Sequence, residues 1–199
     1  MRLFSTAAIV ATLWGGVAAS QAVQRLQDVV ERPFVANGRI TMDLSAGAYR
    51  IVGGPDRRIR ITWSARDRER YRKLDVRAEA DGPRATVTTD GPVNNDFRAT
   101  IDVPARTDLV IRLSAGELRI EGIEGDKDIS QHAGEIDIDI GDPKSYRRVE
   151  ASVWAGELHV QPFGATREGL FRSFDWNGNG RYRLNARLKA GELRLHAAR

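Results

Sequence analysis

The sequence predicts an all-β protein, an irregular single-domain β-solenoid (β-helix-like) with antiparallel strands in the N-terminal half. Three observations predict this class. The chain of 199 residues contains five Ala-Gly steps, each followed by a short segment in which apolar and polar residues alternate. Most of the remaining sequence alternates apolar and polar residues, and Gly, Pro, Asn and Asp clusters punctuate it. A repeat indicates stacked units, because one such unit cannot bury its apolar face alone.

The first 22 residues are typical of a secretory signal peptide. Arg2 precedes an apolar stretch over residues 3–17, and small residues lead to a cleavage site after Ala22. An uncleaved anchor is the alternative, but this stretch is shorter than the roughly 20 residues that span a membrane. The chain has no cysteine for disulfides or lipidation. We therefore expect a periplasmic or secreted bacterial protein with no transmembrane segment in the mature chain.

A short leader over residues 23–33 is expected next, with one helical turn through Leu26 and Val30. The β-solenoid-like domain then occupies residues 34–197. Its front part reads as antiparallel strands, separated by turn signals such as Asn37-Gly38, with a polar loop or short helix over 65–72. The strands are expected near residues 34–35, 39–44, 59–63, 74–78, 85–89 and 97–103.

The repeats dominate the chain from Leu109 onward. Apolar side chains stand two and four residues after each repeat glycine, and three residues before most of them. The step between these two sets is odd, so regular alternation would place them on opposite faces. The strand is therefore predicted to bend or bulge at each glycine, which permits unusual dihedrals and close approach of the next unit. These structural glycines are Gly47, Gly116, Gly134, Gly156 and Gly191.

The repeated apolar-x-Ala-Gly-Glu-apolar-x-apolar units behind a signal peptide resemble the bacterial putative-adhesin, or toast-rack, domain family. The resemblance covers roughly Phe34 to His196. It implies an all-β, solenoid-like domain of the cell envelope, commonly without assigned activity. The family supplies no catalytic residues that could be carried over to this sequence.

Charge is distributed unevenly over a net +4. Residues 57–77 hold nine basic and three acidic side chains, whereas residues 116–142 hold two basic and nine acidic ones. Trp63 shares a strand face with Ile59 and Ile61, so it is predicted to be core and not a base-stacking platform. Export also argues against nucleic acid. An envelope protein or an anionic or glycan polymer is the expected class of partner, and the oligomeric state is left open.

Stacking of the repeats would align Glu117, Glu135, Glu157 and Glu192 in a ladder with rungs about 4.8 Å apart. The adjacent outward column holds Arg119, Asp137, His159 and Arg194, so a basic residue type stands beside the glutamate in three of four rungs. This pattern favours a solvated, charged face. A cation or polysaccharide site on this ladder is one alternative, and a glycosidase or lyase with paired carboxylates is another. Glu135, Asp137 and Asp139 are weak candidates for a calcium site, since no calcium-loop motif surrounds them. We expect no metal and no cofactor.

Trp154 occupies a repeat column that otherwise holds Ser45, Ser114, His132 and Lys189. An aromatic side chain there predicts either a partner contact or a cover over the end of the core. The stretch from Phe163 to Gly180 interrupts the repeats, is rich in aromatic residues and glycine, and is predicted to form binding loops. The predicted binding residues are Trp154, His159, Phe163, Phe174 and Trp176. The sequence thus predicts a non-enzymatic envelope module that binds a protein or polymer; a carbohydrate-active enzyme and a passive scaffold are the alternatives.

Overall fold

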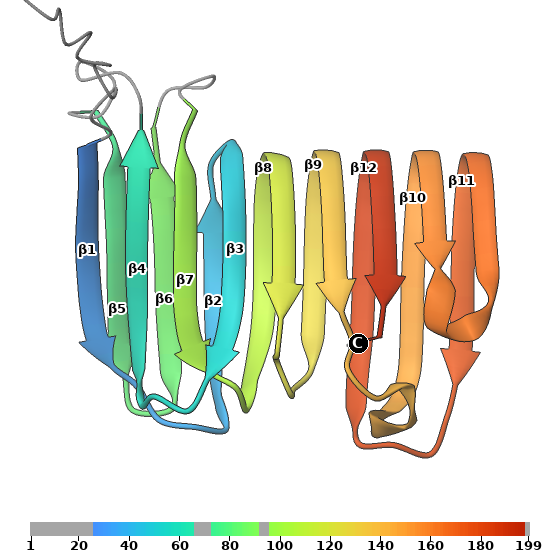
Figure 1. The fold of residues 1–199 in the computed structure, drawn as a ribbon, viewed down its shortest axis with the longest axis horizontal. Helices are drawn as coiled ribbons and strands as arrows, with labels where there is room; N and C mark the ends of the chain where they lie inside the picture. Colours follow the sequence, from blue (N-terminus) through green and yellow to red (C-terminus); the bar gives the residue numbers. More distant parts are fainter. Residues whose placement is uncertain (1–25, 66–72, 92–95, 198–199) are drawn as a thin grey trace, which may run out of the picture.

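The computed structural model describes residues 26–65, 73–91 and 96–197. Its strands lie side by side in a row, and those of the C-terminal half double back at one edge of the molecule (Figure 1). The strands are β1 (Leu26–Pro33), β2 (Gly38–Leu44), β3 (Gly47–Gly54), β4 (Arg58–Ala65), β5 (Asp75–Asp81), β6 (Arg84–Asp90), β7 (Arg98–Pro104), β8 (Thr107–Glu121), β9 (Lys127–Asp139), β10 (Tyr146–Val160), β11 (Ala165–Asn177) and β12 (Tyr182–His196). Short 3-10 helices cover Pro143–Ser145 and Gln161–Phe163.

The pairing register divides the fold into two layers. The first half of β8 pairs with β2, and β2 pairs with β6 and β6 with β5. The second half of β8 pairs with β3, which continues through β7 and β4 to β1. Each long strand therefore crosses from one layer to the other, and the apolar side chains of both layers meet between them.

One large mixed sheet results, so the all-β prediction is confirmed. The strand order along its main path is β1-β4-β7-β3-β8-β9-β12-β10-β11, and the sheet does not close. The solenoid itself stays a prediction. The antiparallel N-terminal half is correct only in part, because β2 and β3 pair in parallel with their neighbours in both layers. The alternation of apolar and polar residues within a strand does not show whether its neighbour runs parallel or antiparallel to it.

The repeat glycines lie in register in one column at the bends. The order across the sheet is Gly47, Gly116, Gly134, Gly191 and Gly156. The last four have φ between +116° and +133°, whereas Gly47 has no positive φ. A Cβ at Gly134 would lie 1.9 Å from the carbonyl oxygen of Gly116. Close backbone stacking and a left-handed φ thus both require glycine there.

The core lies between the two layers and is continuous along the row. The residues at two and four places after each glycine are buried, as are Leu44, Leu113, Val153 and Leu188 three places before. In β9 the residue three places before the glycine is Gln131, which is 1% exposed. Its Nε2 donates to the Gly116 and Ala133 carbonyls, both at 2.9 Å, so an amide replaces the apolar group beneath this bend. Trp63, at 8% exposure, is core as predicted.

Two expectations about chain organisation are corrected. The helical turn through Leu26 and Val30 is wrong, because β1 pairs with β4 as a strand and so brings part of the leader over 23–33 into the sheet. The presumed loop between Phe163 and Gly180 is mostly strand β11, which pairs with β10. The last repeat, β12, lies between β9 and β10, so the order of strands in the sheet differs from their order in the chain. The predicted signal peptide over 1–22 and most of the polar segment 65–72 lie outside the described residues.

No helix among the described residues is long and apolar enough to cross a membrane.

Candidate functional site

The exposed aromatic corner, defined as Trp154, Leu170 and Phe171, lies where β10 and β11 bend at the end of the row. These side chains are 56%, 58% and 70% exposed. The Trp154 and Phe171 rings stack edge to face with centroids 5.5 Å apart. Phe171 has φ +54°, which is costly for a bulky residue. Large exposed apolar groups held in one place are typical of an interaction surface.

The other predicted aromatic binding residues lie elsewhere and face the core. Phe163 stacks on Trp176 at 4.8 Å and on Phe174 at 5.4 Å between ring centroids. All three are partly buried and pack against the hydrophobic core. They close the end of the core beneath β11, so the structure does not place them beside Trp154 on one exposed surface. A binding role for Phe163, Phe174 and Trp176 stays a prediction.

Sequence reasoning missed Leu170 and Phe171 as partners of Trp154. The register pairs Ala155 with Leu170 across β10 and β11, which brings the two bends together. No Ala-Gly step marks β11; only Gly169, with φ +109°, indicates the bend. That lone glycine is the one signal that could have suggested it.

The charge ladder crosses β8, β9, β12 and β10 in the second half of each strand. Arg119 lies 3.2 Å from Glu117 and 3.8 Å from Asp137, between guanidinium nitrogens and carboxylate oxygens. Arg194 contacts Glu192 and lies 3.9 Å from Glu135. These pairs are exposed, and each contributes on the order of 0–1 kcal/mol. The ladder is therefore a surface on which Arg119 and Arg194 pair with the carboxylates of β8, β9 and β12.

His159, another predicted binding residue, lies within this ladder between two carboxylates. Its Nε2 is 3.0 Å from Glu157 Oε2 and 3.2 Å from Glu192 Oε1. The ligand atoms of these three residues all lie within 4.8 Å of one another. One hydrogen bond joins His159 Nε2 to Glu157, and Arg194 already pairs with Glu192. The cluster could accept a metal ion sterically, but ion pairing explains it without one.

The three weak calcium candidates do not converge on a common point. Glu135 faces Arg194, whereas Asp137 Oδ1 lies 2.9 Å from His196 Nε2. Asp139 accepts a hydrogen bond of 2.8 Å from the Gly141 amide. Successive outward residues on one strand are about 6.8 Å apart, too far for one ion to bind them all.

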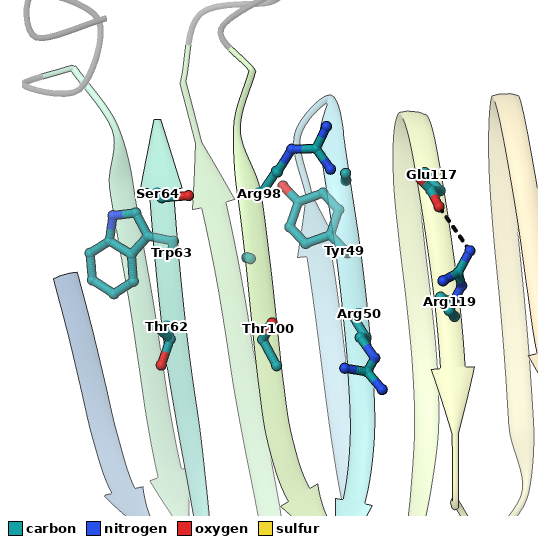
Figure 2. A pocket seen from close by; sticks show the side chains of 11 residues that line it. Tyr49, Arg50, Thr62, Trp63, Ser64, Arg98, Thr100, Glu117 and Arg119 are labelled. Atoms are coloured by element: carbon teal, nitrogen blue, oxygen red, sulfur yellow. Dashed lines mark hydrogen bonds and ion pairs between the residues drawn. The ribbon is translucent and has the colours of Figure 1, made fainter. Parts of the chain in front are cut away.

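A groove opens on the sheet face over β4, β7 and β3 (Figure 2). Its volume is about 380 Å³, within the range of about 300–1,000 Å³ that small-molecule sites occupy. Ala48 occupies the position where the following rungs carry the ladder glutamates, and this short side chain leaves the hollow. The lining residues are Ala48, Tyr49, Arg50, Thr62, Trp63, Ser64, Arg98, Ala99, Thr100, Glu117 and Arg119.

The groove is positively charged on balance, with three arginines against Glu117. Arg50 donates to Glu121 through Nε at 3.1 Å and Nη2 at 2.6 Å. The hydrogen bond from Arg50 lowers the pKa of the Glu121 carboxyl and raises that of the guanidinium. Arg119 is paired with Glu117, as the dashed line in Figure 2 shows. The Arg98 side chain is exposed and its guanidinium has no hydrogen bond or ion pair to another described residue.

A buried polar pair, Lys127 and Tyr146, lies at the opposite edge of the strands from the bends. Lys127 is 2% exposed, and its Nζ donates to Tyr146 Oη and to the Ile123 carbonyl, both at 2.8 Å. Burial lowers the pKa of Lys127 to about 8 and raises that of Tyr146. The described residues around Lys127 enclose its side chain, so we assign it to the packing of the core and not to a binding site.

Comparisons with known proteins place the fold. No family model matches the chain, and no curated protein matches its sequence. A solved structure described as a putative cell adhesion protein from Clostridium sporogenes ATCC 15579 is 14% identical, with a TM-score of 0.58, over 88% of this chain and 100% of that one. A putative adhesin from Bacteroides fragilis NCTC 9343 is 7% identical, with a TM-score of 0.31, over 87% and 99%. A putative adhesin from Parabacteroides merdae ATCC 43184 is 6% identical, with a TM-score of 0.26, over 57% and 58%. The chain therefore shares its fold with the clostridial cell adhesion protein, and the resemblance to the putative-adhesin family holds at the level of fold.

Proposed function

We propose that this protein is an exported, non-enzymatic binding module of the cell envelope that engages a partner through the exposed aromatic corner. The observation that carries the proposal is the exposure of Trp154, Leu170 and Phe171 together at one bend. Aromatic side chains at the centre of a contact supply much of its free energy, since they bury a large area at a low cost in side-chain entropy. The putative cell adhesion protein from Clostridium sporogenes, which has the same fold, supports a binding role.

Strain at Phe171 supports the same role. A phenylalanine in the left-handed region costs about 1–2 kcal/mol relative to glycine there. Cross-strand stacking on Trp154 recovers about 0.5–1.5 kcal/mol of this. Phe171 therefore contributes little to the free energy of folding, and its side chain is exposed. Positions that cost stability without contributing to the core are commonly functional.

The alternative, a glycosidase or lyase that uses the ladder carboxylates, fits the geometry less well. A general acid needs a carboxyl whose pKa is raised by burial. Glu117, Glu135, Glu157 and Glu192 instead lie on an outward sheet face beside Arg119, Arg194 and His159. These ion pairs occupy the carboxylates on an open sheet face, whereas an acid catalyst lies in a buried site.

Binding to separated envelope fractions tests the proposal. Purified protein is mixed with membranes, peptidoglycan and soluble envelope polymer, and the bound share is measured after sedimentation or size exclusion. We expect one fraction to retain the wild-type protein. The variants Trp154→Ala and Phe171→Asn should lose at least about tenfold in affinity, as hot-spot truncations do. Asn tolerates a positive φ, so Phe171→Asn should fold as stably as the wild type.

The matched control is Val35→Ala, which removes another exposed apolar side chain, 48% exposed, far from the bend. It should bind like the wild type. Equal binding by all four proteins, with unchanged thermal unfolding, would refute the aromatic corner as the contact surface.

A further inference from the structure

We propose that the groove over β4, β7 and β3 is a second binding site, which takes an acidic glycan: a chain of sugar rings that carries carboxylate groups. This site lies apart from the aromatic corner, so it goes beyond the proposed function and does not depend on it. The argument rests on which polar groups line the groove and on which of them have no protein partner.

Hydroxyl groups form one part of the lining. Ser64 and Thr62 face outward from β4, and Thr100 faces outward from the adjacent β7. None of these three hydroxyls has a hydrogen bond to another described residue. Figure 2 shows them beside one another on the sheet surface. Unpaired hydroxyls that both donate and accept are suited to the hydroxyl groups of a sugar.

A cation forms the second part. Arg98 is the register partner of Ser64 on one side and of Ala48 on the other, so it lies between a hydroxyl and an open position. Arg50 and Arg119 flank the groove but already pair with Glu121 and Glu117. Arg98 is therefore the guanidinium that is free to bind a carboxylate, with which it can form two parallel hydrogen bonds.

The shape of the groove favours a chain over an isolated ion. Four adjacent strands, β4, β7, β3 and β8, line it, which spans about 14 Å at about 4.8 Å per strand. Short side chains such as Ala48 and Ser64 form part of the lining, and the groove is open to solvent at the sheet surface. An extended polymer can therefore lie across the strands with an acidic group at Arg98 and ring hydroxyls over Thr62 and Thr100.

An acidic protein segment is the competing ligand, and the lining argues against it. Peptide recognition on a sheet face relies on apolar pockets or on free backbone groups at a strand edge. The strands β7 and β3 are paired on both sides, so the groove offers no free strand edge there. The described polar groups that have no protein partner include three hydroxyls and the Arg98 guanidinium, a set that matches an acidic glycan better.

Calorimetric titration with three defined probes tests the site: hexagalacturonate, the neutral sugar cellohexaose, and a hexaglutamate peptide. We expect hexagalacturonate to bind more tightly than both others. Arg98→Ala should weaken its binding about tenfold, because a charge-assisted pair is lost. Thr62→Val combined with Thr100→Val should also weaken it while keeping β-branched strand residues.

Arg112→Ala is the matched control, because Arg112 is an exposed arginine on the other layer, paired with Asp43 at 3.5 Å. Its binding should equal that of the wild type, and the unfolding temperature of every variant is measured to confirm folding. Equal losses in Arg98→Ala and Arg112→Ala would mean unspecific charge attraction and overturn the site. Tighter binding of hexaglutamate, or no effect of the threonine changes, would overturn the glycan assignment. Trp154→Ala should bind hexagalacturonate normally, which separates this result from the proposed function.

Discussion

Among single residues, Lys127 makes the free energy of unfolding depend on pH. Its pKa is lowered to about 8 by burial, below the value of about 10.4 in an unfolded chain. Below pH 8 the buried ammonium is charged and destabilises the fold. As pH rises above 8, the folded protein releases this proton before the unfolded chain does, so stability increases.

We therefore predict that the free energy of unfolding rises by about 1 kcal/mol between pH 7 and pH 9. Tyr146 acts in the opposite sense above pH 10, because its raised pKa keeps the folded form protonated while the unfolded chain ionises. The free energy of unfolding should therefore be highest at a pH above the pKa of folded Lys127 and below the pH at which Tyr146 of the unfolded chain ionises. Urea unfolding at several pH values measures it, and Lys127→Met should remove the rise. A rise that persists unchanged in Lys127→Met would assign it to other groups.

His159 makes a prediction about the ladder. It bridges Glu157 and Glu192 on β10 and β12, so His159→Ala leaves two carboxylates facing each other across the strands. Like charges opposite each other are unfavourable, and a loss of about 0.5 kcal/mol is expected at low salt. The loss should shrink in 1 M salt, where screening is strong. A salt-independent loss of several kcal/mol in thermal or urea unfolding would contradict a surface ion pair.

At the scale of strands, the glycine column sets how closely the bends stack. An added Cβ at Gly116 would lie 2.0 Å from the Gly47 carbonyl oxygen, and the φ of +123° is unfavourable for any side chain. Gly116→Ala should therefore destabilise the protein by at least about 3 kcal/mol. Gly141→Ala is the control: it has φ +62° and no atom within 4 Å of the added Cβ, so it should cost only about 1 kcal/mol. Equal losses in urea unfolding would show that close stacking does not matter.

The same strands show what sequence could predict and what it could not. Five Ala-Gly steps recur within one chain, so their alignment predicted the bends and the buried columns from internal comparison alone. Phe171 has no counterpart in that alignment, because β11 lacks the Ala-Gly step and runs antiparallel to β10. The groove depends on the pairing of Thr62 with Thr100, two residues 38 positions apart in strands that carry no repeat. Alternation predicts which face a residue takes, but not which strand lies beside it.

For the whole molecule, the position of β12 determines how the C-terminal half holds together. This last strand lies between β9 and β10 and pairs in parallel with both. Its buried side chains, Leu184, Leu188, Leu193 and Leu195 among them, complete the core of that half. The strands β10 and β11 therefore join the rest of the sheet only through β12, the last strand of the chain to be synthesised. Non-local pairing of this kind slows folding.

We predict that a chain ending at Arg181 cannot fold its C-terminal half, because β9 and β10 would each present an unpaired edge and an open core. Unpaired edges with apolar faces promote aggregation. Circular dichroism and size exclusion should show lost strand content and aggregation. A synthetic peptide of residues 182–199 should restore β10 and β11 when present during refolding, whereas the same peptide with Gly191→Val should fail, because its Cβ would meet the Gly134 carbonyl. A truncated chain that unfolds cooperatively at the wild-type temperature would show that β9 and β10 hold their places without β12.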